Sequence, residues 1–242
     1  MKNTAIIIPT RLEAKRFPNK PLAKIKDIPM IIHTLKRAKE SKVGEVFVAT
    51  PDNEIINIVK ENGGNAFLTS NSHLSGSDRV YEVYSKILKG KADLIVNLQG
   101  DMPNINPNAI LKLVKLMREN KCDIGTLASN LSNEEINDPN VVKVHVDEEL
   151  SEKKFLNAKD FFRKKKDLKI QRIYHHIGIY AFTSHALTKY VNLSRSKFEI
   201  ERNLEQMRAM ENNMVVKVGY CDTSPLSVDT EKDLEKIIQE MN

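Results

Sequence analysis

The chain of 242 residues lacks the features that mark membrane and secreted proteins. It has no run of 18 apolar residues, so we expect no insertion into a membrane. The apolar stretch near the N-terminus is too short for a signal peptide and has no small-residue cleavage site. The only cysteines, Cys122 and Cys221, have no Cys or His motif beside them. Reduced thiols and a cytoplasmic protein are therefore expected.

Two common nucleotide-binding motifs are also missing. No GxGxxG follows the first predicted strand, which argues against a dinucleotide-binding fold. No GxxxxGK[ST] occurs, which argues against a P-loop enzyme. If the chain binds a nucleotide, it must do so with other residues.

Positive charge is concentrated in two segments. Residues 1–40 carry ten lysines and arginines against three acidic residues, and residues 151–172 carry nine against three, in a chain with a net charge of +6. Two basic segments in an otherwise acidic chain indicate anionic ligands at two places. Nucleic acid is the competing partner, but neither segment has interleaved aromatics and no nucleic-acid-binding signature occurs, so we expect no nucleic acid.

The first half of the chain alternates short apolar runs with amphipathic segments. Strands are expected at 4–8, 45–49, 65–68 and 94–98, and helices at 28–41, 52–62, 77–89 and 107–120. This alternation predicts a parallel sheet with helices on both faces.

The pattern changes after about residue 122. Strands are expected at 123–130, 141–146, 175–182 and 215–220, helices at 184–191, 199–212 and 230–241, and an irregular basic segment at 150–172. We therefore predict an α/β fold, with a doubly wound, mostly parallel sheet and a smaller antiparallel insertion, folded as one domain.

The first predicted strand ends in a cationic loop, with Arg11, Lys15, Arg16 and Lys20 in ten residues. Arginine presents a planar fork of donors to phosphate oxygens, and lysine presents a compact charge. Ligands of open α/β sheets bind at the carboxyl ends of the strands, where this loop lies. The loop is therefore a candidate polyphosphate site, and a solvated basic loop is the alternative.

Two aspartates are candidate ligands of Mg2+. Asp101 comes directly after an apolar strand, in the segment Gln99–Gly100–Asp101, and Asp229 precedes the last predicted helix. Mg2+ prefers one or two carboxylates together with substrate phosphates. Each aspartate has a local alternative, because Asp101 can shape a turn and Asp229 can be the N-cap of the last helix.

The segment around Ser75 and Gly76 lies at the start of a predicted helix, together with Asp78 and Arg79. Free N–H groups at a helix N-terminus suit an anion or the edge of a base. A simple capped turn is the alternative.

His176 and Tyr180 lie on one face of a predicted strand by alternation, so they can contact one polar ligand together. No Ser-His-Asp or Cys-His arrangement of a nucleophile occurs in the sequence. Direct displacement by a substrate is therefore expected rather than a covalent enzyme intermediate.

Taken in order, these segments resemble the 3-deoxy-manno-octulosonate cytidylyltransferases, or CMP-Kdo synthetases. The similar segments cover most of residues 4–146 and 174–240 and include IIIPTRLEAKRFPNKPL, VFVATPD, LSGSDRV, IVNLQGDMP, HHIGIYAF, NLEQMR and SVDTEKDLE. The resemblance implies a nucleotidyltransferase fold related to the Rossmann fold. It also implies that the anomeric hydroxyl of Kdo attacks the α-phosphate of CTP, releasing pyrophosphate, for lipopolysaccharide biosynthesis.

The resemblance assigns roles to individual residues and parts of the chain. It implies Mg2+ held by Asp101 and Asp229, a homodimer, a CTP-binding portion at 1–130, a sugar-binding and dimerisation portion at 131–225 and a closing helix at 226–242. The catalytic residues that it implies are Arg11, Lys20, Asp101 and Asp229. The substrate-binding residues that it implies are Arg16, Ser75, Gly76, Asp78, Arg79, Gln99, His176, Tyr180, Glu205 and Gln206.

The sequence also departs from the family pattern. In the cationic loop, Ala14 replaces a serine and Asn19 a glycine, and Leu156-Asn157 stands where the family has a sugar-side Ser-Arg. Arg163 or a neighbouring lysine is a candidate replacement for that arginine. The alternatives are a cytidylyltransferase for an amino-modified Kdo or a nine-carbon acid sugar, and a non-catalytic CTP-binding regulator.

Overall fold

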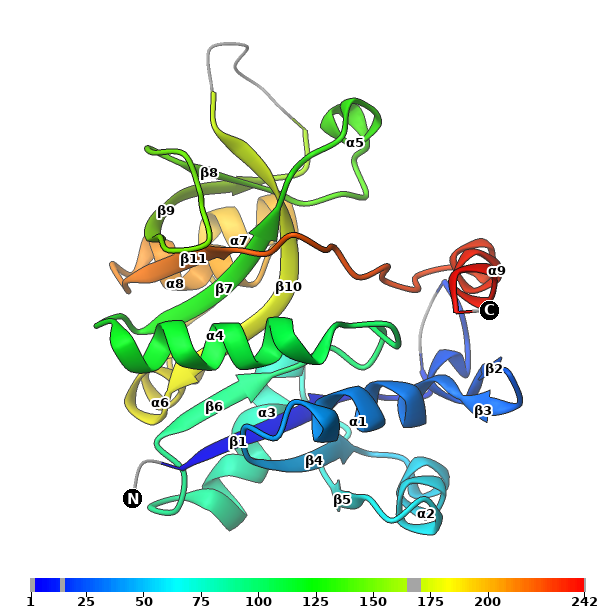
Figure 1. Ribbon diagram of the computed structural model, residues 1–242. Helices are drawn as coiled ribbons and strands as arrows, with labels where there is room; N and C mark the ends of the chain where they lie inside the picture. The colour runs from blue at the N-terminus through cyan, green and yellow to red at the C-terminus, as the bar shows by residue number, and fades with distance from the viewer. Residues whose placement is uncertain (1–2, 14–15, 165–170, 242) are drawn as a thin grey trace. The chain divides into compact units, whose positions relative to one another are not determined.

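A computed structural model describes residues 3–13, 16–164 and 171–241. The chain forms two compact units, one of Met1–Leu111 with Pro225–Asn242 and one of Lys112–Ser224 (Figure 1). Both units combine helices and strands, so the expected α/β class is confirmed. Ala14 and Lys15 of the cationic loop lie outside the described residues.

The first unit contains four parallel strands in the order β5–β4–β1–β6. The strands are β1 (Thr4–Pro9), β4 (Glu45–Thr50), β5 (Asn65–Leu68) and β6 (Leu94–Asn97). The isoleucines Ile6, Ile7 and Ile8 of β1 have no exposed surface, as a strand covered on both faces requires.

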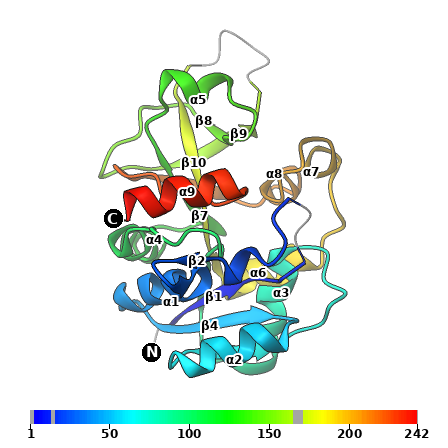
Figure 2. The same ribbon diagram turned by 90° about the vertical axis from the view of Figure 1, so that its right-hand side faces the viewer.

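The connections of this sheet place helices on both of its faces. They contain α1 (Met30–Glu40), α2 (Asn53–Glu61) and α3 (Gly76–Val83), which continues into a π-helical turn at Tyr84–Leu88. The chain moves from β1 outward to β4 and β5 and then returns to β6. Right-handed crossovers therefore place α1 and α2 on one face and α3 on the other (Figure 2).

Short elements complete the first unit. They are a 3-10 turn at Lys20–Leu22, the hairpin β2 (Lys24–Ile25) and β3 (Ile28–Pro29), and the helix α9 (Glu231–Glu240). The helix α4 (Pro107–Glu119) runs across the boundary at Leu111. Ile25, Met30, Val228 and Ile237 form a buried cluster that attaches α9 to the segment before α1.

The second unit contains five strands whose pairings close on themselves. The strands are β7 (Ile124–Ser129), β8 (Lys143–Val146), β9 (Phe155–Phe162), β10 (Ile173–Thr183) and β11 (Val216–Tyr220). Their order is β10–β7–β11–β9–β8, and β8 also pairs with β10. Only β7 and β11 are parallel. The expectation of a mostly parallel sheet therefore holds for the first unit alone.

Two predictions of secondary structure in the second unit are wrong. The segment 150–172 is not irregular, because residues 155–162 form β9. The helix predicted at 199–212 is two helices, α7 (Lys197–Arg202) and α8 (Gln206–Glu211), because Asn203 adopts a left-handed conformation with φ of 52°. The remaining helices are α5 (Asn133–Asn137) and α6 (Ser184–Val191).

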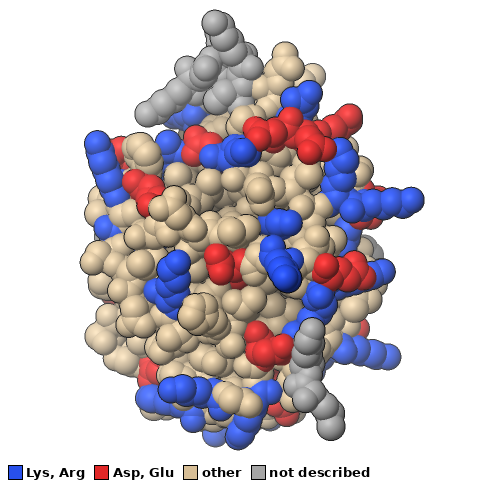
Figure 3. Space-filling model, turned by 90° about the vertical axis from the view of Figure 1, so that its left-hand side faces the viewer, with Lys and Arg blue, Asp and Glu red and all other residues tan. Residues whose placement is uncertain are grey.

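Charges of both signs are interspersed on the face drawn in Figure 3. Within the described part of the basic segment 151–172, two lysines pair with acidic residues, Lys154 with Glu148 at 2.9 Å and Lys159 with Asp147 at 2.6 Å. Among the described residues, no helix combines the length and the apolarity that crossing a membrane requires.

Candidate active site

The cationic loop leaves β1 and returns to its starting point. The Thr10 amide donates to Ala49 O of β4 at 3.0 Å, and the Leu12 amide donates to Asp52 Oδ2 at 2.8 Å. The Asn19 amide then donates to Leu12 O at 3.0 Å, which closes the loop. Asn19 has a left-handed backbone with φ of 57°, and asparagine tolerates that conformation better than other residues with a side chain. Asparagine can therefore take the place of the family's glycine.

Lys20, at the end of this loop, lies between the two predicted aspartates. Its Nζ is 2.9 Å from Asp101 Oδ2 and 3.6 Å from Asp229 Oδ1, and it also donates to Val228 O at 2.8 Å. The two carboxylate oxygens are thus no farther apart than the sum of those two distances. The structure therefore brings together residues that are far apart in the sequence, all within the first unit.

Hydrogen bonds to main-chain carbonyls fix the segments that carry the two aspartates. The Val228 amide donates to Asp101 O at 3.0 Å, so the segment before α9 is attached to the end of β6. The Thr34 hydroxyl of α1 donates to Gly100 O at 3.1 Å. Val228 itself is fully buried in the cluster beneath α9. The pairing of the aspartates thus depends on tertiary packing.

Asp229 is not the N-cap of the last helix, which corrects the local alternative. Thr230 is the N-cap, and it forms a reciprocal capping box with Asp233. The Asp233 carboxylate accepts from the amide and hydroxyl of Thr230 at 2.9 and 2.8 Å. Because Thr230 caps the helix, the side chain of Asp229 remains available to cations.

The two arginines of the loop are exposed. Arg16 Nη2 lies 3.1 Å from Asp229 Oδ2, and its side chain is 62% exposed. Arg11 lies close enough to Arg79 to lower the pKa of Arg79 by repulsion, in addition to the larger effect of burial. The loop therefore presents positive charge toward the carboxylates and toward α3.

The site lies at the carboxyl ends of β1 and β6, which are neighbouring parallel strands. The strand order reverses here, because the chain goes from β1 to β4 and β5 and then returns to β6 on the other side of β1. This position is the ligand-binding crevice of open α/β sheets. Among the described residues, no group of three or more His, Cys, Asp or Glu side chains gathers to hold a metal. Two carboxylates with positive charge around them instead suit Mg2+ carried on phosphates, so Asp101 and Asp229 fit the expected ion.

Four of the predicted substrate-binding residues, Ser75, Gly76, Asp78 and Arg79, lie at the start of α3. Ser75 is the N-cap and Asp78 completes a capping box, with the Asp78 amide donating to Ser75 Oγ at 3.2 Å. The predicted capped turn is therefore present. Arg79 is buried, and its Nη1 donates to Ser70 O at 3.1 Å and to the Thr69 hydroxyl. A Cβ on Gly76 would approach Pro9 Cγ to 3.4 Å, which places the start of α3 beside the end of β1.

Gln99 follows β6 directly. Its Nε2 donates to Asn97 Oδ1 at 3.1 Å, and its side chain is half-buried. This bond holds the amide beside the strand end that also carries Asp101.

Four of the substrate-binding residues implied by the resemblance lie in the second unit, namely His176, Tyr180, Glu205 and Gln206. His176 is buried, and its Nε2 lies 3.0 Å from the Thr126 hydroxyl. Burial, and secondly the charge of His175, lowers the pKa of His176 to about 3, so its ring is neutral. A bulge in β10 between Ile177 and Tyr180 breaks the expected alternation.

The rings of His176 and Tyr180 are nevertheless 5.4 Å apart, so they are neighbours. Burial, and then the charge of Glu205, raises the pKa of Tyr180. Gln206 is buried, and its Nε2 has no hydrogen-bond partner among the described residues. His176 and Glu205 thus both lie near Tyr180.

A family model described as cytidylyltransferase matches residues 5–218. A curated 3-deoxy-manno-octulosonate cytidylyltransferase of Bartonella tribocorum is 42% identical over 96% of each chain. Its counterpart in Brucella canis is 41% identical over 96% of this chain and 93% of the relative. The chain belongs to the cytidylyltransferase family.

A solved structure of CMP:2-keto-3-deoxy-manno-octonic acid synthetase complexed with CTP is similar to this cytidylyltransferase, with a TM-score of 0.90 and 34% identity. The match covers 99% of this chain and 98% of the other. The UTP-bound UGPase of Acinetobacter baumannii, at a TM-score of 0.70 and 11% identity, shares the fold alone. The resemblance inferred from the sequence is therefore confirmed, and the protein is a nucleotidyltransferase.

The site of this cytidylyltransferase includes two residues that the sequence argument missed. Asp52 begins the segment predicted as a helix at 52–62 and was not among the expected site residues, but its carboxylate accepts from the Leu12 amide and so anchors the cationic loop. Thr34 anchors Gly100 from within α1. Both act by long-range bonds, for which local sequence has no signal.

The replaced Ser-Arg pair lies on β9, which pairs with β11 through Leu156 and Asn157. Asn157 is exposed. Arg163, the candidate replacement, donates to Pro139 O and Asn140 O at 3.3 and 3.0 Å. Its guanidinium is thus engaged by the chain itself.

Proposed function

We propose that this cytidylyltransferase transfers CMP from CTP to the anomeric hydroxyl of Kdo, releasing pyrophosphate, in lipopolysaccharide biosynthesis. The observation that carries the proposal is the convergence of Asp101 and Asp229 on Lys20 at the ends of β1 and β6. Such a cluster suits a triphosphate, whose oxygens need both cations and a divalent ion.

The cations of the first unit neutralise the triphosphate in this proposal. Arg11 and Arg16 are exposed at the loop, so they can approach phosphate oxygens without unfolding it. Lys20 donates to Asp101, and in this proposal it exchanges that carboxylate for a phosphate oxygen when the triphosphate binds. Catalysis is then mainly positioning and stabilisation of charge.

Asp101 and Asp229 would hold Mg2+. When bound, the ion would polarise the α-phosphate and stabilise the departing pyrophosphate. The carboxylates also keep the cationic loop in place through Lys20 and Arg16 when no nucleotide is bound.

The base and the sugar would be bound by different residues. We assign the base to Ser75, Gly76, Asp78 and Arg79 at the start of α3. We assign the sugar to Gln99, His176, Tyr180, Glu205 and Gln206. His176 is neutral in this proposal and can only exchange hydrogen bonds.

The proposal is tested by measuring pyrophosphate release with CTP, Mg2+ and a panel of acid sugars. Kdo should give the highest kcat/KM. Release with an amino-modified Kdo or a nine-carbon acid sugar, but not with Kdo, would replace the sugar and keep the reaction. CTP binding without release on any sugar would identify a regulator instead.

The alternative sugar is favoured by one observation. The family's sugar-side arginine is replaced by Asn157, and Arg163 is engaged with two main-chain carbonyls. A missing charged contact to a carboxylate costs a few kcal/mol of binding, on the order of a hundredfold in KM. We further propose that the protein is cytoplasmic and forms a homodimer. Light scattering of the purified chain tests the homodimer.

A further inference from the structure

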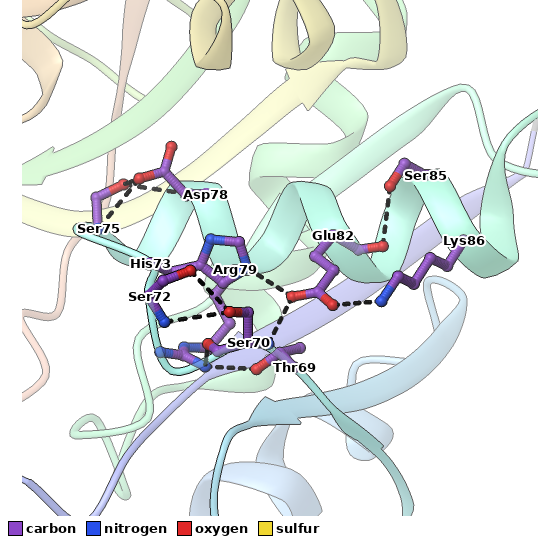
Figure 4. A network of polar contacts seen from close by, with 10 residues as sticks. All are labelled: Thr69, Ser70, Ser72, His73, Ser75, Asp78, Arg79, Glu82, Ser85 and Lys86. Atoms are coloured by element: carbon purple, nitrogen blue, oxygen red, sulfur yellow. Dashed lines mark hydrogen bonds and ion pairs between the residues drawn. The ribbon is translucent and has the colours of Figure 1, made fainter.

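The loop at residues 69–75, between β5 and α3, is held by side chains from α3 itself (Figure 4). We propose that Glu82 and His73 are positioning residues for the nucleotide base. They fix this loop, and through it Arg79 and the start of α3, before the nucleotide arrives. The inference deepens the proposed function and rests on it, because it concerns the base-side residues assigned above.

Ser70 is bound on both sides by α3. Its amide donates to Glu82 Oε2 at 2.9 Å, and its carbonyl accepts from Arg79 Nη1 at 3.1 Å. Arg79 also donates to the Thr69 hydroxyl. Figure 4 shows both side chains reaching the loop from successive turns of the helix. The main chain of Ser70 is therefore fixed by two side chains of opposite charge.

His73, in the second half of the loop, contacts the same carboxylate of Glu82. Its Nε2 lies 2.5 Å from Glu82 Oε2, so this oxygen receives both the ring and the Ser70 amide. The side chain of Glu82 is only 13% exposed. Burial alone would raise the pKa of Glu82, but hydrogen bonds from Lys86, Ser70 and His73 lower it to about 2. Glu82 is therefore a permanent anion.

Apolar burial does not hold this loop. Its largest apolar side chain, Leu74, is 84% exposed. The polar bonds to Glu82 and Arg79, with local bonds such as Ser72 N to Ser70 Oγ at 3.2 Å, hold the loop instead. Loss of Glu82 or His73 should therefore loosen it while the apolar core of the unit stays intact.

A fixed loop matters because of where Arg79 lies. Arg79 is buried, and the charges of Asp52 and Glu82 favour its cationic form while burial and Arg11 oppose it. Its Nη1 donates to Thr69 and Ser70 of the loop. The position of the loop therefore sets the direction in which the other N–H groups of the guanidinium point. The acceptor atoms on the edge of a pyrimidine base would then meet guanidinium donors that are already oriented, so binding would not require the loop to rearrange.

The experiment compares E82Q and H73A with K86M. Lys86 contacts Oε1 of Glu82 at 2.5 Å, whereas the loop contacts Oε2. K86M is therefore the matched control, because it removes a contact of Glu82 that does not involve the loop. Hydrogen exchange of residues 69–76 is measured without nucleotide, and kcat and KM are measured with CTP and with the sugar. H73Q, which keeps an N–H donor, is the rescue variant.

We expect exchange in residues 69–76 to accelerate in E82Q and H73A. Their KM for CTP should rise roughly tenfold, with kcat and the KM for the sugar within about twofold. Discrimination against UTP should also fall, because the base is then held less firmly. K86M should stay within about twofold of the unmodified protein, and H73Q should recover most of the KM.

Faster exchange with an unchanged KM for CTP would show that the contacts are only structural and overturn the inference. If E82Q does not fold, H73A and H73Q decide, because His73 lies in the loop and outside the helix. An unmodified protein that neither binds nor consumes CTP would refute the proposed function and this inference together. Normal CTP turnover with unaffected variants would refute the inference alone.

Discussion

Two clusters of carboxylates and cations, one in each unit, have similar distances but opposite surroundings. In the first unit, Lys20 lies 2.9 Å from Asp101, and these side chains are 16% and 23% exposed. In the second unit, Arg208 contacts Glu199 at 2.6 and 2.9 Å, and these side chains are 4% and 1% exposed. Distance alone therefore does not distinguish a functional ion pair from a structural one.

The difference lies in how completely each carboxylate is used. Both oxygens of Glu199 are occupied, by Arg208, by Arg195 at 3.2 Å and by the Ser196 amide at 3.1 Å, so the pair attaches α7 to α8. The side chain of Asp229, by contrast, is 40% exposed, and within the described part of the chain its ion pairs are with Arg16 and Lys20 of the loop. An exposed carboxylate can exchange its partner for a ligand, and an enclosed one cannot.

The largest expected effect is on turnover in D101N and D229N. Asparagine keeps the shape of the side chain but removes the charge that would hold Mg2+, so kcat should fall by roughly a hundredfold to a thousandfold or more. The thermal midpoint should change little, because these ion pairs are partly exposed. Activity like that of the unmodified protein in both variants would refute the metal assignment.

The next effect is on stability, in E199Q. Removing this charge breaks a buried ion pair in which Glu199 contacts both Nε and Nη2 of Arg208, which should cost about 3–5 kcal/mol of the free energy of unfolding. Urea unfolding measures the loss. R37A is the control, because Arg37 and Glu40 form an exposed pair worth less than about 1 kcal/mol. Equal losses in the two variants would contradict the comparison.

A smaller effect is expected from acid. The pKa of His176 is about 3 in the folded chain and about 6.5 when unfolded, so the unfolded state binds more protons between these values. Stability should therefore fall as pH falls below 6, by up to roughly 1.4 kcal/mol per pH unit. H176Q should lose this part of the slope between pH 7 and 4. An unchanged slope would show that His176 titrates normally.

The smallest effect is expected in R16A. The Arg16 side chain is 62% exposed, so its pair with Asp229 contributes less than about 1 kcal/mol to stability. The KM for CTP should rise by about twofold to fivefold, and this difference should shrink at high salt. A loss as large as that of D229N would show that Arg16 does more than attract the phosphates.

The elements of the first unit could be predicted because their apolar pattern is local. The uninterrupted isoleucines of β1 and the stripe of α1 identify a strand and a helix without further information. The aspartate pair could not be found this way. The residues alone offered Asp101 and Asp229 as candidate ligands of one ion but left a local alternative open for each. The bond from Val228 to Asp101, which attaches their segments to each other, joins residues far apart in the sequence and has no local signal.

The missed elements have physical causes. In β9 the buried residues Phe155, Ala158 and Phe161 recur every three positions, because the register with β8 shifts at the bulge. The pattern of period two is therefore lost. The helix break at Asn203 was missed because a residue that tolerates a left-handed backbone need not adopt one. At the last helix, Thr230 rather than Asp229 is the N-cap because it pairs with Asp233 three residues later.

The attachment of Val228 to the end of β6 has a consequence for biosynthesis. During translation, β1 and β6 leave the ribosome long before Asp229 does. A nascent chain can thus form its parallel strands while one of the paired carboxylates is still missing. A chain that ends before Asp229 should accordingly retain those strands but lack one of the two carboxylates of the proposed catalytic centre.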